Sequence, residues 1–305
     1  MVKVGIIGAE SPLAGEIIRI LVNHPETEIM GLHAPSLFGH NVTSIHHGLI
    51  GEQSLIFTDK IILEDLSFLI LIGNSELGNS ILSQLSYWEN LKIVIVNDPT
   101  DRSKLDFFEI GLSEINRKAL VRGAQYAYIP SPVIVPALIA LYPIANYLLL
   151  NSDIQINIQL PSDISENLDE EKEAKKIEDL LKNIQVSYKG KVNLKINSDH
   201  QSERAATTLI TFNNNLSISD VEKIFESIYD DHNFTFITKN LVNVNEVEGT
   251  QKVVIQINKP SLETLEIKIV SDARMRGGAG DVVHVLNLFF GLHEKTGLNL
   301  KPSRF

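Results

Sequence analysis

The amino-terminal segment constrains the fold of this chain more than any other. A short apolar run at residues 3–7 ends in Gly8, apolar residues at helical spacing follow (Ile17, Ile18, Ile20, Leu21), and a second strand is predicted at 28–32. This strand–glycine–helix–strand order begins a dinucleotide-binding βαβ unit. Further strands are predicted at 55–57, 66–72 and 93–96. We therefore expect a Rossmann-type α/β domain with a parallel sheet.

The turn after the first strand departs from the dinucleotide fingerprint. It reads Gly8-Ala-Glu-Ser-Pro-Leu-Ala-Gly15, so it has two glycines, and Pro12 removes a backbone N–H that could face a phosphate. The segment 32–40 offers neither an acid for a ribose hydroxyl nor an arginine for a 2′-phosphate. His33 or His40 could touch a phosphate or be ordinary surface or core residues. A plain strand-to-helix turn is the alternative to a cofactor site.

Two polar residues follow the predicted strand 66–72. Because open parallel sheets bind ligands at the carboxyl ends of their strands, Asn74 and Ser75 are candidate contacts. The alternative is that they form the N-cap of the next helix.

Composition excludes several classes of function. The chain has 305 residues, enough for about two domains, and a net charge of −11, which argues against nucleic-acid or anionic-membrane partners. It has no cysteine, which excludes disulfides, thiolate zinc sites and thiol catalysis. His46 and His47 have no convergent carboxylate nearby in sequence, so we expect no metal site. The apolar run 133–150 approaches the length of a membrane span, but Pro136 and Pro143 interrupt it. We expect a buried helix, no signal peptide and a cytoplasmic protein.

The second half of the chain predicts a different kind of domain. Strand patterns occur at 153–160, 184–196 (a hairpin around Lys189-Gly190), 204–212, 234–237, 252–257 and 266–270, and Ser219-Asp-Val-Glu222 reads as a capping box. Successive strands with short turns predict an α+β domain with a mostly antiparallel sheet and helices on one face. Such a sheet is a common dimer surface. A resemblance to a known family, described below, implies that residues 1–130 and 284–305 form the Rossmann-like NAD(P)-binding domain, and that 131–283 form a second domain of catalytic and dimerisation type.

A glycine-rich basic segment precedes the last predicted helix. Arg274, Arg276, Gly277, Gly278 and Gly280 together form the best candidate anion site in the sequence, because backbone N–H groups and guanidinium groups both bind oxyanions. The alternative is a flexible turn with solvated arginines.

Two long blocks resemble the N-acetyl-γ-glutamyl-phosphate reductase family. They are Phe108-Glu-Ile-Gly-Leu-Ser-Glu-Ile-Asn-Arg-Lys-Ala-Leu120, and Asp272-Ala-Arg-Met-Arg-Gly-Gly-Ala-Gly-Asp-Val-Val-His-Val-Leu-Asn287. The resemblance implies a Rossmann domain, an α+β domain, and a last helix that returns to the first domain. It implies NADPH-dependent reduction of an acyl phosphate to an aldehyde, through a cysteine thiolate and a histidine acid/base. It also implies NADP contacts, which we place at Gly8, Ser11, Pro12, Leu13, Asn74, Gly278 and Gly280.

The chain departs from that family at its reacting groups. The family's cysteine falls on Pro132, which has neither a nucleophile nor an N–H. Ser131 is an alternative nucleophile, although we interpret Ser131 and Pro132 as the N-cap and first residue of the following helix. The family's catalytic histidine falls on Glu173, inside a segment (166–182) that reads as a solvated helix, and His200 is a candidate remnant of a family histidine.

The nucleotide end departs from the family too. Its three glycines appear as Gly8, Ser11 and Ala14, and its arginine after the second strand appears as Pro35.

Three functions follow from these patterns. The first is a catalytically inactive homologue that works as a binding or regulatory subunit, as a homo-dimer or homo-tetramer or with an active paralogue. The alternative is a functional NADP-dependent acyl-phosphate or semialdehyde oxidoreductase with an altered mechanism, using Ser131 with Glu173. The third is a metabolite sensor that binds anions at Arg274, Arg276 and His200.

Overall fold

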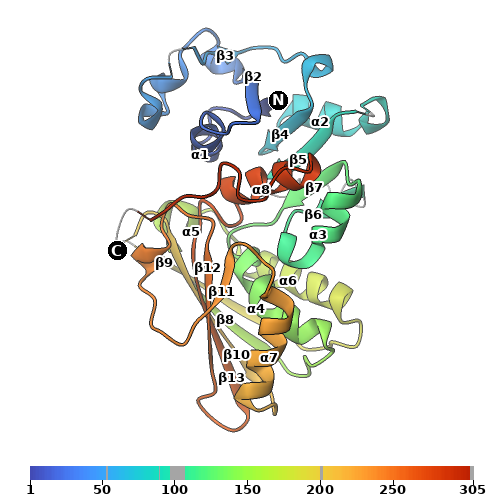
Figure 1. Ribbon diagram of the computed structural model, residues 1–305, viewed down its shortest axis with the longest axis vertical. Coiled ribbons are helices and arrows are strands. Elements are labelled where there is room, and N and C mark those ends of the chain that lie inside the picture. The colour runs from blue at the N-terminus through green and yellow to red at the C-terminus, as the bar shows by residue number, and fades with distance from the viewer. Residues whose placement is uncertain (53, 89, 97–106, 200–201, 303–305) are drawn as a thin grey trace. The chain divides into compact units, whose positions relative to one another are not determined.

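The computed structural model describes residues 1–52, 54–88, 90–96, 107–199 and 202–302. The chain forms two compact units (Figure 1). The first unit combines Met1–Ser131 with Gly278–Asn299, and the second consists of Pro132–Gly277 with the residues from Leu300 onward. The polypeptide therefore leaves the first unit at Ser131 and re-enters it at Gly278.

A seven-stranded sheet in the order β3-β2-β1-β4-β5-β7-β6 organises the first unit. All of its pairings are parallel. The strands are β1 (Val2–Ile7), β2 (Thr27–His33), β3 (Phe57–Thr58), β4 (Phe68–Ile72), β5 (Lys92–Val96), β6 (Glu109–Ile110) and β7 (Tyr126–Ile129). The helices are α1 (Pro12–Leu21), α2 (Glu76–Leu82), α3 (Ser113–Arg122) and α8 (Ala279–Phe289). The strand order reverses between β1 and β4, so the carboxyl ends of these two strands border the crevice where such sheets bind ligands.

The last helix completes this unit. All residues of α8 are buried, and the helix packs against α1, α3, β5 and β7. Oδ1 of Asn287 in α8 accepts a hydrogen bond from Nε2 of His24 at 3.0 Å, and Lys92 donates to the carbonyl of Phe289. The predicted return of the last helix to the Rossmann unit is confirmed.

A six-stranded mixed sheet in the order β11-β12-β13-β10-β8-β9 organises the second unit. Its central pairings are antiparallel, whereas β8–β9 and β11–β12 are parallel. The strands are β8 (Ile154–Pro161), β9 (Val192–Asp199), β10 (Ala205–Asn213), β11 (Thr235–Ile237), β12 (Val253–Asn258) and β13 (Thr264–Asp272). The helices are α4 (Ile134–Asn146), α5 (Ser162–Ser165), α6 (Glu170–Ile184) and α7 (Ile218–Tyr229). Helices α4, α6 and α7 pack on this sheet (Figure 1).

Helix α4 begins later than the sequence predicts. Its N-cap is Val133, with no side-chain cap, so the interpretation of Ser131 as the N-cap and Pro132 as the first helical residue is wrong. Pro132 lies in a turn before the helix and is buried. Pro136 falls in the first turn, where the missing N–H has no intrahelical acceptor, and the helix continues through Pro143. Almost every residue of α4 is buried, as expected for a core helix.

Two local predictions in the second unit are wrong. The segment 184–196 does not form a hairpin: Ile184 ends α6, and β9 begins at Val192 and runs parallel to β8. The capping box at Ser219 is also misplaced, because Ser217 caps α7 and accepts a hydrogen bond from the N–H of Asp220. In both places the sequence pattern lies close to an element boundary: β9 begins at Val192, after Lys189-Gly190, and α7 begins after Ser217.

Helix α6 is amphipathic rather than solvated on all sides. Glu173 and Lys176 are buried and form an ion pair at 2.9 Å. Glu170 and Glu178 accept hydrogen bonds from the N–H groups of Ile196 and Val192, at 2.7 and 3.0 Å. Because β9 is an edge strand, these carboxylates cover donors that would otherwise be open to another strand.

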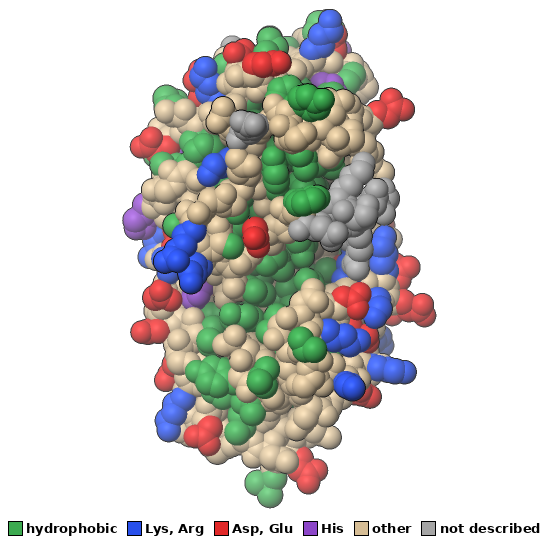
Figure 2. All heavy atoms as spheres, turned by 90° about the vertical axis from the view of Figure 1, so that its right-hand side faces the viewer, with side chains coloured by type: hydrophobic (Ala, Val, Ile, Leu, Met, Phe, Trp, Pro, Cys, Tyr) green, Lys and Arg blue, Asp and Glu red, His purple; other side chains and the backbone are tan. Residues whose placement is uncertain are grey.

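The surface carries mixed charge. On the face that Figure 2 shows, basic and acidic side chains are interspersed, so it has no extended basic field. Within the described ranges no helix is long and apolar enough to cross a membrane. Those ranges also contain no group of three or more His, Asp or Glu side chains that could hold a metal ion.

Candidate functional site

The turn between β1 and α1 is built on Gly8. Its φ is +83°, and a Cβ there would lie 2.5 Å from the carbonyl oxygen of Ile72 in β4, so only glycine fits. Ser11 caps α1 and accepts from the N–H of Ala14 at 3.2 Å, and Pro12 is the first helical residue. Ser11 and Pro12 therefore form the start of α1.

Most backbone donors of this turn are already paired. The N–H groups of Gly8 and Ala9 both donate to the carbonyl of His33, at 3.3 and 3.2 Å. Across the described residues, the N–H groups of Glu10 and Leu13 have no hydrogen-bond partner. These two N–H groups at the start of α1 are what this turn offers to a diphosphate.

His46 has a structural role beside this turn. Its Nε2 lies 2.8 Å from the carbonyl oxygen of Ala9, and a Cβ at Gly15 would lie 2.6 Å from its ring. Gly15 therefore provides the space for the imidazole. The sequence suggested only a metal or an isolated histidine here.

The end of β2 carries no basic side chain. His33 is buried, and Pro35 begins a 3₁₀ turn at Pro35–Leu37. The chain has no lysine or arginine between Arg19 and Lys60. Nothing in this stretch supplies the cation that a 2′-phosphate needs.

Of the two residues after β4, Ser75 is the N-cap of α2 and accepts from the N–H of Gly78 at 3.0 Å. The side-chain oxygen Oδ1 of Asn74 accepts a hydrogen bond from Nδ2 of Asn79 at 2.6 Å.

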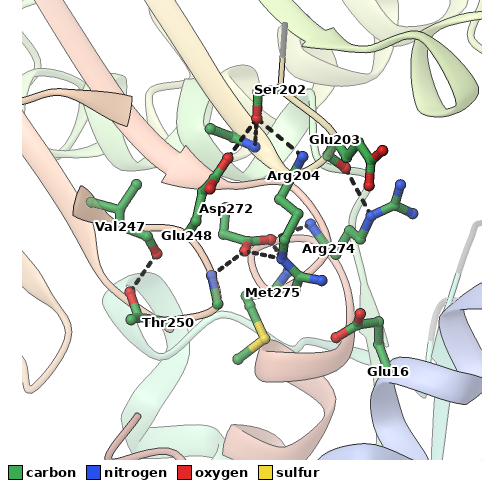
Figure 3. Close-up of polar contacts among 12 residues, drawn as sticks. Glu16, Ser202, Glu203, Arg204, Val247, Glu248, Thr250, Asp272, Arg274 and Met275 are labelled. Carbon is green, nitrogen blue, oxygen red and sulfur yellow. Dashed lines mark hydrogen bonds and ion pairs between the residues drawn. The ribbon is translucent and has the colours of Figure 1, made fainter. Parts of the chain in front are cut away.

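In the second unit, the buried carboxylate of Asp272 is the centre of a polar cluster (Figure 3). One oxygen accepts from Arg204 Nε at 2.8 Å and from the N–H of Gly249 at 2.6 Å. The other accepts from the N–H groups of Arg274 and Met275, at 2.8 and 3.1 Å. Asp272 thus fixes the turn that carries both predicted anion-binding arginines.

The two arginines have different environments. The side chain of Arg274 is 22% exposed, and its guanidinium donates to Asp163 Oδ2 at 2.8 Å and to the carbonyl of Glu203 at 3.0 Å. Arg276 is 1% exposed and is not a solvated side chain. The alternative of a turn with solvated arginines is therefore wrong for Arg276, and Asp272 hydrogen-bonds the backbone of the turn. Gly278 is the N-cap of α8, and Gly280 is buried in its first turn.

The remaining predicted residues are dispersed. Pro132 is buried, Ser131 is half-buried, and Glu173 is buried on α6 with Lys176 as its ion-pair partner. His200 lies outside the described residues. No sequence pattern indicated a role for Asp163. Asp272 does open the glycine-rich basic block, so its position was visible but its role was not.

The fold and the two-part construction of the first unit define the semialdehyde dehydrogenase class of architecture. Aspartate semialdehyde dehydrogenase II from Vibrio cholerae, complexed with ASA, matches 95% of this chain and 98% of its own length, with a TM-score of 0.71 and 12% identity. The enzyme from Candida albicans, solved with NADP, matches 95% and 98% with a TM-score of 0.66 and 15% identity.

Sequence comparison gives the family. N-acetyl-gamma-glutamyl-phosphate reductases of Parabacteroides distasonis and Azobacteroides pseudotrichonymphae are each 31% identical to this chain, with 100% of both chains covered. That of Bacteroides fragilis is 30% identical over the same coverage. No family model matches the chain. The chain belongs to the N-acetyl-gamma-glutamyl-phosphate reductase family.

Proposed function

We propose that this chain is a homologue of N-acetyl-gamma-glutamyl-phosphate reductase that does not carry out thiol chemistry and acts as a binding or regulatory subunit in amino-acid biosynthesis, specifically of arginine. The observation that carries the proposal is the absence of any cysteine from the 305 residues. By the resemblance, the family's reaction forms a thioester, and no other side chain supplies a thiolate.

The environment of the substituted position supports the same conclusion. The residue that the resemblance places at the cysteine, Pro132, is buried and has no N–H to stabilise an oxyanion. Glu173, placed at the acid/base histidine, is 4% exposed and held by Lys176. The Glu173 carboxylate is thus engaged by Lys176 at 2.9 Å rather than directed at a substrate.

We propose that the first unit can bind the diphosphate of a dinucleotide but has no site for a 2′-phosphate. The N–H groups of Glu10 and Leu13 at the α1 start would hold a diphosphate, and NADPH bound there would supply the hydride of the family's reaction. The end of β2 does not fit a 2′-phosphate, since the chain has no lysine or arginine between Arg19 and Lys60. We therefore propose weak binding in which NADP has no advantage over NAD.

Self-association is proposed through the outer face of the six-stranded sheet. Along β8, Ile154, Ile156 and Ile158 are buried, whereas Gln155, Asn157 and Gln159 are exposed. Because helices pack on the other face, these uncharged amides face away from the helices and do not repel a second copy. Asn157→Lys should then lower the molar mass measured by light scattering toward that of the monomer. Asn183→Lys, on the exposed surface of α6, should leave the molar mass unchanged. Equal molar masses for the two variants would argue against this interface.

The proposed function is tested by calorimetric titration with NADPH and NADP⁺, followed by a phosphate-dependent oxidation assay with the family's semialdehyde. We expect a folded protein without turnover. Turnover comparable to that of an ordinary reductase would overturn the proposal. Activity that Ser131→Ala abolishes would instead establish an oxidoreductase with an altered mechanism.

A further inference from the structure

We propose that Arg274 is a pre-formed binding residue for a small oxyanion and that Asp163 is an internal competitor that occupies it. The inference deepens the proposed function and rests on it, since it names how a binding protein of this kind would control its ligand site. It concerns residues of the second unit only.

The backbone beneath Arg274 is held rigidly. The Asp272 carboxylate accepts from the N–H of Arg274 and of Met275, and Arg204 balances its charge at 2.8 Å. The Arg274 side chain is oriented in turn, because its Nε donates to the carbonyl of Glu203 at 3.0 Å (Figure 3). A guanidinium positioned before a ligand arrives loses little conformational entropy when the ligand binds.

The donors of Arg274 are incompletely used. An arginine has five N–H donors, and here Nε and Nη2 make the side-chain hydrogen bonds. Within the described part of the chain, Nη1 makes none. The contact with Asp163 is a single hydrogen bond at 2.8 Å rather than a bidentate pair, although a guanidinium binds carboxylates and phosphates most strongly through two parallel bonds.

The Asp163 carboxylate is easily displaced. Its side chain is 56% exposed and belongs to the one-turn helix α5. An ion pair this exposed contributes little, because water competes for both partners. An incoming carboxylate or phosphate could use Nη1 and Nη2 together while Asp163 turns into water. Asp163 thus lowers the affinity of the site without closing it.

The inference is tested with the full chain by calorimetric titration of inorganic phosphate and, separately, of glutarate, which distinguish a phosphate site from a carboxylate site. Asp163→Asn keeps the shape of the side chain and removes its charge. We expect it to tighten binding of at least one anion by about three- to tenfold relative to wild type. Asp179→Asn on α6 is the matched control, since it removes the same charge elsewhere, and should change the affinity by less than about twofold.

A second substitution locates the effect. Adding Arg274→Gln to Asp163→Asn should abolish the gain, with circular dichroism confirming that the variants fold. The inference is overturned if Asp163→Asn binds no more tightly than Asp179→Asn, or if the gain survives Arg274→Gln. Because the readout is anion affinity, this failure is distinct from the discovery of reductase turnover, which would overturn the proposed function.

Discussion

The carboxylate of Asp272, which is fully buried, lies 2.8 Å from Nε of Arg204 across two adjacent strands of the second unit. The pair joins the start of β10 to the end of β13, which are antiparallel neighbours. Three backbone N–H groups complete the hydrogen bonding of the carboxylate. Removing the Asp272 carboxylate therefore leaves the Arg204 guanidinium and three backbone N–H groups without their acceptor.

We expect Asp272→Ala to lower the free energy of unfolding by about 3–5 kcal/mol, because it strands a partly buried guanidinium and three N–H donors. Asp163→Ala, which breaks an exposed ion pair, should cost less than about 1 kcal/mol. Urea unfolding of the two variants is the measurement. Similar losses for both would show that the Asp272 cluster is not a structural centre.

The stability of the first unit should depend on the protonation of His24. Burial lowers the pKa of His24 below its usual 6.5, and the hydrogen bond with Asn287 opposes this only in part. Because the unfolded chain binds the proton more tightly, stability is lost as the pH falls below 6.5 toward the folded-state pKa. His24→Gln should remove this component of the pH dependence. If the difference in unfolding free energy between wild type and variant is the same above and below pH 6.5, protonation of His24 is not coupled to unfolding.

The edge of β9 should depend on the α6 carboxylates. Glu178→Ala removes the acceptor of the Val192 N–H and should cost about 1–2 kcal/mol. Asp179→Ala removes the neighbouring acid, which pairs with exposed Lys175 at 2.8 Å, and should cost less than about 0.5 kcal/mol. Thermal unfolding compares the stability of the two variants.

The same carboxylates should protect the protein from aggregation. Light scattering should show more aggregation for the double variant Glu170→Ala/Glu178→Ala, since it exposes the N–H groups of the edge strand. An unchanged aggregation rate would count against this protection.

A substitution at Leu148, two residues after α4, should raise the stability of the protein. Leu148 has a φ of +61° and a 64% exposed side chain, so it bears the cost of a left-handed conformation while burying little surface. We expect Leu148→Gly to raise stability by about 0.5–1 kcal/mol. Tyr147→Gly, at a residue with φ −88°, should lower it. Differential scanning calorimetry measures both, and a destabilised Leu148→Gly would refute the backbone argument.

The sequence predicts β1, β2, β4 and β5 close to their final bounds because these strands are apolar runs, whereas it did not predict β6 and β7. Strands β4 and β5, for example, are almost entirely buried, which removes alternation and leaves a clear signal. The start of α4 was harder. A serine followed by a proline is typical of a helix N-terminus, yet the helix begins at Ile134. The Ser131-Pro132 pattern therefore predicted a helix start within a few residues of the true one, but not its first residue.

The candidate site was less predictable because its contacts join distant segments. Arg274 and Asp163 are 111 residues apart, and nothing in the local pattern of α5 indicates its partner. The same holds for β9, where Lys189-Gly190 suggested a hairpin but the strand pairs in parallel with β8 across α6. Glu173 and Lys176 look like ordinary surface charges in sequence, and only packing against neighbouring elements buries them.

The two-segment construction of the first unit has a consequence for synthesis. During translation the whole of Pro132–Gly277 leaves the ribosome before α8 does. The long segment of the second unit can therefore begin to fold first, whereas the strands of the first unit wait with the surface that α8 covers exposed to water. A premature stop shortly before Gly278 would keep that long segment of the second unit, but it would leave the first unit without its closing helix.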